Sequence, residues 1–467
     1  MPRFDISRFP ALKLQWSAYK ILALLFIVFC LSSIDTWYSG YGWHDQQRIC
    51  QLLLLWFVAL FVPFLPKKAL PKPLLLLLVV FFSLGLCSSL LAKFPEWAFR
   101  EWGRYVGLLL LSLLVSGLSQ RQLYSSLIFW MMAAVGLVHA YQFFLYYVMA
   151  FVTGIHMLDA DMLYSGFSNP RFLGQFQVML LPVLALLLSV CCRQRQWGLS
   201  LLLLFSLIAH WCITFSLGGR GVWLGLLVAH ITLVLLDYRY WRVPALQMCA
   251  ALLGFSLYLL FFKLIPLWLG IDLVLPDNLR TTLSGRERIW QIAWEMALAN
   301  PWLGVGPMHY SATYNPIAAH PHQVVLQFLS EWGFPAAIIF IAMIFWAGYR
   351  SVSHLRRSVV NEVDAGLWLA IVGALVLAQV DGVFVMPYAE TWLASLLGLA
   401  LARCGELSIP PRFQQLTCIF VCVPVLIVLG KVLVGEAPAM FSDSIDPISQ
   451  HHGGNRPRFW SQGWLQY

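Results

Sequence analysis

The sequence predicts an all-α, polytopic integral membrane protein. Of its 467 residues, 60% are hydrophobic and 11% are charged, whereas a soluble domain is about half apolar and a quarter charged. Apolar runs of about 20 residues, the length that crosses a bilayer as a helix, recur from near the start of the chain to near its end. Lys and Arg are spread singly through short connections, so we interpret the net charge of +9 as a topology signal and not as a nucleic-acid-binding surface.

Apolar runs between polar breaks predict about 12–13 transmembrane helices, the first of them retained after a basic amino terminus. We expect a polytopic membrane domain over 1–434, a large periplasmic loop over 268–322 within it, and a periplasmic carboxyl-terminal tail over 435–467. The predicted spans are 21–36, 51–65, 74–92, 105–118, 123–152, 172–191, 198–216, 222–236, 245–267, 324–347, 365–385, 391–403 and 415–434.

Basic residues predict the orientation. If the amino terminus is cytoplasmic, every inside connection carries Lys or Arg, as the positive-inside rule requires. Arginines on the other side are not needed for orientation and are candidates for function. They are Arg48, Arg171, Arg220, Arg286 and Arg288, together with Arg100 and Arg104, which we expect to pair with Glu96 and Glu101.

The long loop is predicted to contain a helix that lies along the membrane surface. Ser284 followed by Glu287 forms a capping box, and apolar residues from Ile289 to Ala297 recur on one helical face. Asn300 and Pro301 predict its end.

Four predicted helix starts on the outer side share one chemical character. Each offers free backbone N–H groups and the positive end of a helix dipole, which together favour an anion. Arginine adds a fork that matches phosphate oxygens, so several such starts facing one cavity would suit a diphosphate. Any single arginine could instead anchor the chain at a lipid headgroup. The starts are Asn169-Pro170-Arg171, the glycine-rich turn before Arg220, the pair Arg286 and Arg288, and the stretch from His320 to Gln323.

His322 is the candidate base, because histidine can take a proton from a hydroxyl near neutral pH. His320 and His322 alone leave a metal ion short of ligands, so no metal is expected. Glu331 would lie about 180° round a helix from His322. We therefore expect Glu331 to pair with an arginine or to pack against a neighbouring helix, and Asp381 and Glu390 are further candidates for pairing.

The stretch from His320 to Gly333 resembles the bacterial O-antigen ligase and O-antigen polymerase superfamily, which includes the pilin O-oligosaccharyltransferases. It is similar to that family's pattern of a histidine, usually followed by Asn, then Leu-Gln and Glu-x-Gly, with Gln323 at the Asn position. Pro301–Gly306, the turn around Arg220, Arg286–Trp290 and Gly166–Phe172 support the resemblance, which covers roughly residues 160–385.

The resemblance implies a metal-independent, inverting glycosyltransferase of the bacterial inner membrane that needs no cofactor. Its donor would be an undecaprenyl-diphosphate-linked glycan, and its active site would face the periplasm. His322 would be the catalytic base, and Arg220 and Arg288 would bind the diphosphate. The helix-start argument adds Arg286 and Arg171 as diphosphate ligands, with His320, Gln327, Glu331 and Asn169 in support.

The acceptor is left open by the resemblance. A pilin acceptor is placed slightly ahead of lipid A–core, because the Asn169–Phe172 stretch is closer to the pilin-modifying branch. Polymerisation on a second lipid-linked glycan comes third. A transporter or flippase of lipid-linked glycan is the alternative from a different class. It would be expected to show an internal repeat with matched broken helices, which the sequence does not show.

Overall fold

The computed structural model is almost entirely helical. It describes residues 10–37, 42–65, 68, 70–118, 122–274, 285–357, 359–404, 411–438, 458–460 and 463–465. The helices are α1 (Pro10–Leu31), α2 (Trp43–Phe61), α3 (Lys72–Leu91), α4 (Pro95–Leu118), α5 (Gln122–Val152), α6 (Pro170–Arg193), α7 (Trp197–Ser216), α8 (Arg220–Leu236), α9 (Arg242–Leu259), α10 (Ile265–Leu269), α11 (Arg286–Ala299), α12 (Val324–Arg357), α13 (Glu362–Leu377), α14 (Pro387–Cys404) and α15 (Pro411–Lys431).

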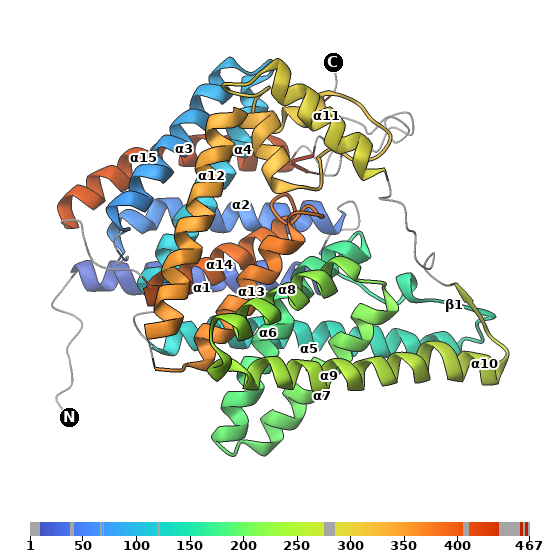
Figure 1. Ribbon diagram of the computed structural model, residues 1–467. Coiled ribbons are helices and arrows are strands. Elements are labelled where there is room, and N and C mark those ends of the chain that lie inside the picture. The colour runs from blue at the N-terminus through green and yellow to red at the C-terminus, as the bar shows by residue number, and fades with distance from the viewer. Residues whose placement is uncertain are drawn as a thin grey trace, which may run out of the picture.

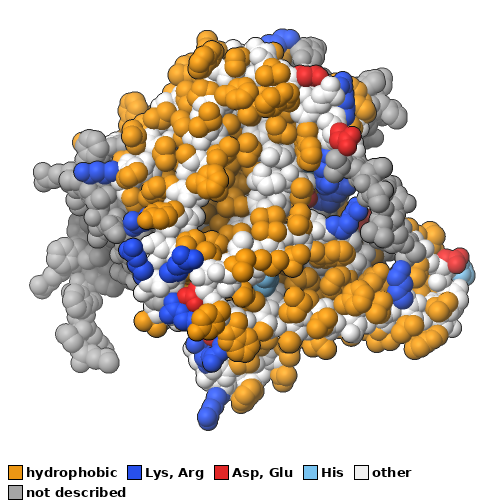
Figure 2. Space-filling model, viewed as in Figure 1, with side chains coloured by type: hydrophobic (Ala, Val, Ile, Leu, Met, Phe, Trp, Pro, Cys, Tyr) orange, Lys and Arg blue, Asp and Glu red, His pale blue; other side chains and the backbone are white. Residues whose placement is uncertain are grey.

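The polytopic all-α class is confirmed. Among the described residues, nine helices are long and apolar enough to cross a membrane, and Ser17–Leu31 and Arg220–Leu236 are shorter apolar helices. Each span expected from the sequence overlaps a helix. Hydrophobic side chains cover most of the face in Figure 2, as a lipid-facing surface requires.

Three helices begin well before the expected starts at 21, 51 and 105, which are wrong: α1 begins at Pro10, α2 at Trp43 and α4 at Pro95. The added turns of α2 and α4 contain buried polar side chains, such as Gln46 and Arg104. In α4, Arg104 pairs with Glu101 at 2.8 Å, and Arg100 lies 3.6 Å from Glu96. The expected pairing of these arginines is therefore confirmed, and it lets the helix continue through charged residues.

The helices at the centre of the molecule carry the candidate site. α6 packs against α7, α8 and α13, and α14 packs against α4. The surface helix α11 lies at the edge of the molecule beside α12 (Figure 1). Its end at Ala299, with Asn300 as the C-cap, confirms the expected end of this helix.

A short sheet joins two loops that are distant in sequence. Strand β1 (Met157–Asp159) pairs in parallel with β2 (Asp272–Val274), with Met157 opposite Asp272. β1 lies on the approach to α6, and β2 follows α10. The pair therefore ties the loop before Arg171 to the start of the long loop that leads to α11.

Helix α12 is kinked where the Pro301–Gly306 motif packs against it. Gly333 has φ +85°, and a Cβ there would collide with the carbonyl oxygen of Trp302. Gly304 also has a positive φ, and a Cβ there would collide with the backbone carbonyl group of Glu331. Only glycine permits this approach, which explains why both motifs contain it.

Candidate functional site

The N-terminus of α6 is built as the sequence predicts. The Asn169 Oδ1 atom accepts a hydrogen bond of 2.9 Å from the backbone N–H of Arg171. Pro170 occupies the first helical position, where its missing N–H costs no hydrogen bond. Arg171 therefore lies in the first turn, and its side chain is exposed.

The turn before α8 also follows the prediction. Gly218 has φ +65°, Gly219 is the N-cap, and the helix begins at Arg220. A Cβ on Gly219 would lie 2.8 Å from the Thr214 side chain. The glycines thus let the chain turn tightly after α7 and present Arg220 at the helix start.

Helix α11 begins at Arg286, after Gly285 in the left-handed region with φ +76°. The expected capping residue Ser284 lies outside the described residues. Arg286 is half-buried, whereas Arg288 is exposed and donates a hydrogen bond of 3.3 Å to Gln291 Oε1. The two arginines of this helix start therefore have different surroundings.

His322 lies in a turn and not in the helix that follows. Its φ is +52°, and α12 begins at Val324. The expected helix start within the stretch from His320 to Gln323 is wrong, because the left-handed backbone of His322 separates Pro321 from the helix. The Gln323 side chain instead caps the helix by accepting a hydrogen bond from the backbone N–H of Leu326.

His322 faces a carboxylate from another part of the chain. Its Nδ1 atom lies 3.6 Å from Asp381 Oδ1. Asp381 is itself held by Gln175 Nε2 at 3.1 Å and by the backbone N–H of Gly382 at 2.7 Å. The three side chains come from α6, from the turn before α12 and from the turn between α13 and α14. The sequence predicted Asp381 only as a pairing residue.

His320 packs directly behind His322. The two rings have centroids 4.1 Å apart, and His320 is buried. Burial holds the pKa of His320 well below its usual range, and the nearby His322, Arg458 and His44 act in the same direction. A Cβ on Gly382 would lie 2.5 Å from this ring. His320 is therefore a neutral, tightly packed support for His322.

Two of the predicted arginines act electrostatically on a third, Arg286. Burial lowers the pKa of Arg286, and Arg171 and Arg220 lower it further, whereas Asp381 raises it. Arg286, at the start of α11, is therefore within electrostatic range of Arg171, of Arg220 and of the carboxylate that faces His322. In Figure 2, basic side chains gather in the hollowed region below α11. Like charges in such proximity favour an anionic ligand.

The remaining predicted residues lie along α12, away from the His322 ring. Gln327 donates a hydrogen bond of 3.2 Å to the hydroxyl of Tyr105. Glu331 accepts from the backbone N–H of Tyr310 at 3.0 Å and pairs with Arg458 at 2.9 Å. Its expected pairing with an arginine is confirmed. The partner, Arg458, was not foreseen, because nothing in the sequence links the tail to α12.

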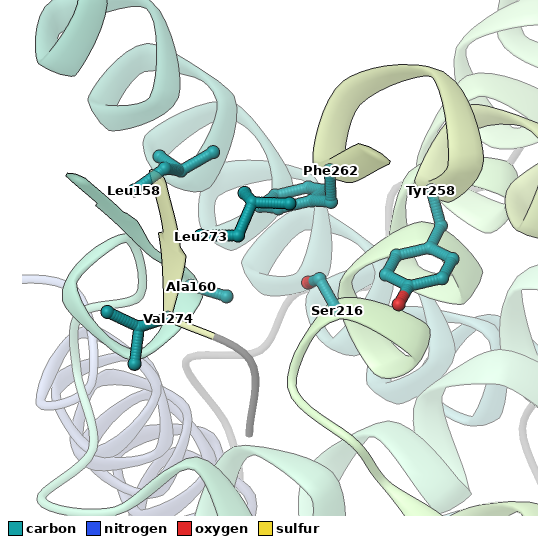
Figure 3. Close-up of a pocket in the computed structure, with 7 residues that line it drawn as sticks. All are labelled: Leu158, Ala160, Ser216, Tyr258, Phe262, Leu273 and Val274. Carbon is teal, nitrogen blue, oxygen red and sulfur yellow. The ribbon is translucent and has the colours of Figure 1, made fainter. Parts of the chain in front are cut away.

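A small apolar cavity lies beside the turn that carries Arg220. Figure 3 shows that its lining residues come from β1 and the segment after it, from β2, from the end of α7 and from the end of α9 with the segment that follows it. The lining residues are Leu158, Ala160, Ser216, Tyr258, Phe262, Leu273 and Val274. Ser216 and Tyr258 are its hydroxyl-bearing residues, and the other lining residues are aliphatic or Phe262.

Within the part of the chain that the structure describes, no group of three His, Cys, Asp or Glu side chains is arranged to hold a metal ion. The groups that the site does bring together are the histidine–aspartate pair and Arg286. A multi-pass membrane protein that gathers these groups at the ends of its helices is suited to act on an anionic, lipid-borne ligand.

Residues 201–341 match the family model for O-antigen ligase. This part of the chain is an O-antigen ligase domain, so the protein is an enzyme of the class that transfers glycans from lipid-linked donors. The matched segment contains Arg220, Arg286, Arg288 and His322, whereas Arg171 and Asp381 lie outside it. No curated protein matches the chain.

Proposed function

We propose that the protein transfers a glycan from undecaprenyl diphosphate to an acceptor hydroxyl on the periplasmic side of the bacterial inner membrane. The observation that carries the proposal is the placement of His322 against Asp381, with Arg286 within electrostatic range of Asp381, Arg171 and Arg220. The reaction needs a base for the acceptor hydroxyl and a binding site for the diphosphate anion, and this cluster contains groups suited to both.

His322 is the general base in this proposal. A carboxylate beside Nδ1 favours the tautomer that carries its proton there, which leaves Nε2 to accept a proton. The acceptor hydroxyl would give its proton to Nε2 as its oxygen attacks the anomeric carbon. A positioned base of this kind typically contributes about 10²–10⁴-fold to the rate.

The arginines stabilise the leaving group. As the new oxygen–carbon bond forms, the bond between the anomeric carbon and the diphosphate oxygen breaks, and its electron pair leaves with the lipid diphosphate. Arg220, Arg286 and Arg171 would hold this developing charge, and Arg288 would meet it from the exposed side of α11. Attack from the face opposite the diphosphate inverts the anomeric centre, and no metal ion is required.

The periplasmic orientation follows from the positive-inside distribution of Lys and Arg along the chain.

For the acceptor, we place a hydroxyl of a membrane-anchored pilin slightly ahead of lipid A–core. A second lipid-linked glycan, as in polymerisation, comes third. The preference rests on the likeness of the Asn169–Phe172 stretch to the pilin-modifying branch. Transport of the lipid-linked glycan remains the alternative from another class, since it would also use a basic cavity.

The test is transfer by the purified protein in nanodiscs, with undecaprenyl-diphosphate-linked glycan and each acceptor separately. We expect glycan on one acceptor, in the presence of EDTA, and no product with His322→Ala. The acceptor that is modified selects the branch. Absence of product on every acceptor, together with movement of the lipid-linked glycan across a liposome bilayer, would favour the transporter.

A further inference from the structure

A row of buried charges connects the helix bundle to the carboxyl-terminal segment. Along this row, arginine and glutamate alternate, and each member is at most 3% exposed. The order is Arg48, Glu390, Arg104, Glu101, Arg458 and Glu331. Three positive and three negative charges therefore balance within this row.

Arg458 is the last cation of the row and forms a two-pronged contact. Its Nη1 lies 2.9 Å from Glu331 Oε1, and its Nη2 lies 3.0 Å from Oε2 of the same carboxylate. The same Nη2 lies 3.1 Å from Glu101 Oε1. Without Arg458, Glu331 would lose its arginine partner in this row, and Glu101 would keep only Arg104 there. A buried carboxylate that loses its partner strongly destabilises the folded protein.

Glu331 also contacts the loop that leads to His320 and His322. Its carboxylate accepts from the backbone N–H of Tyr310 at 3.0 Å, and its backbone carbonyl accepts from Gly306 at 3.0 Å. The segment between Gly306 and Tyr310 is thereby fastened to α12. The chain then runs from Tyr310 to His320 and His322, so the ion pair holds one end of this loop.

Other contacts of the carboxyl-terminal segment reach the same loop. The backbone N–H of Leu465 donates to the Ser311 carbonyl at 2.9 Å, and the Trp464 ring lies 5.1 Å from that of Tyr314. At its other end, the Phe459 carbonyl accepts from Arg48 Nε at 2.9 Å. The segment thus bridges α2 and the histidine loop.

We propose that Arg458 is a positioning residue for glycan transfer. It neutralises Glu331 and Glu101 and so fixes the loop that places His322. This inference rests on the proposed function for its catalytic consequence. The ion pair itself can be tested without a transfer assay, because removing Arg458 changes the balance of buried charge.

The test compares Arg458→Gln, Arg458→Lys and the double variant Arg458→Gln/Glu331→Gln in nanodiscs. The amide introduced by Glu331→Gln keeps an oxygen for the Tyr310 N–H, and the double variant restores charge balance in the row. We expect Arg458→Gln to lower kcat at least tenfold with the KM for donor within about threefold, and to lower the Tm. Arg458→Lys and the double variant should recover most of both quantities.

Arg357→Gln is the control, because Arg357 is exposed at the far end of α12. It should leave kcat and Tm unchanged. A normal kcat in Arg458→Gln, or a double variant that recovers neither quantity, would overturn the inference. If the wild-type protein transfers nothing, the proposed function fails, whereas the pattern of Tm values still decides whether Arg458 balances the two carboxylates.

Discussion

The Nδ1 atom of His322 lies 3.6 Å from the Oδ1 atom of Asp381, although the two residues flank different helices. This short distance between the imidazole and the carboxylate depends on the left-handed backbone of His322 and on the hydrogen bonds that Gln175 and Gly382 donate to Asp381. In the proposed mechanism, Asp381 sets the tautomer and orientation of the base.

Replacing Asp381 by Asn should lower kcat by roughly 10–100-fold, because an amide no longer favours the proton on Nδ1. The KM for donor should change little. Steady-state transfer with varied donor measures both constants. Asn361→Asp is a matched control, since Asn361 caps α13 at a distance from the site. Equal kcat in Asp381→Asn and the wild type would contradict this role.

Replacing Arg286 or Arg288 by lysine tests whether each guanidinium group binds two phosphate oxygens. Arg286→Lys should weaken transfer by roughly tenfold or more, because lysine keeps the charge but loses the fork that binds two phosphate oxygens. The same change at Arg288 tests whether the exposed arginine also binds in this way. Donor binding and kcat/KM are the readouts, with Arg242→Lys as the control. Full activity of both lysine variants would exclude two-pronged binding by α11.

The kink in α12 should not tolerate a side chain. Gly333→Ala should destabilise the protein by about 1–3 kcal/mol, because φ +85° is strained for alanine and its Cβ would meet the Trp302 carbonyl. Gly348→Ala is the control, since Gly348 lies in the same helix with nothing within 4 Å of a Cβ. Thermal unfolding followed by tryptophan fluorescence compares them. Equal Tm values for the two variants would contradict the packing argument.

His320 should make stability depend on pH. Its pKa is lowered in the folded protein, so the unfolded chain binds a proton that the folded chain does not once the pH falls below about 6.5. Stability from this residue is therefore complete above that pH and is lost as the pH falls. His320→Asn should show a smaller drop in Tm between pH 8 and pH 5 than the wild type. An equal drop in both proteins would show that His320 becomes charged without penalty.

Much of the fold could be predicted because lipid imposes a simple rule. Helices must be long and apolar, so the spans and the N-terminal signals of α6 and α8 follow from composition, capping residues and glycine. The rule fails where polar turns are buried, as in α2 and α4, because local patterns do not show which charges will meet.

The site could be predicted only in part for the same reason. Arg171, Arg220 and Arg286 occupy recognisable helix starts, and His322 stands in a distinctive motif. The partners Asp381 and Arg458 lie far away in the sequence and belong to no local pattern. Their roles arise from tertiary contacts, which bring Asp381 to His322 and Arg458 to Glu331.

The most direct test is the single-turnover rate of glycan transfer by wild-type protein and by His322→Ala, with donor binding measured in parallel. We expect the rate to fall by about 10²–10⁴-fold while the Kd for donor stays within about threefold, since the arginines are untouched. An unchanged transfer rate in His322→Ala would contradict the proposal that His322 is the base.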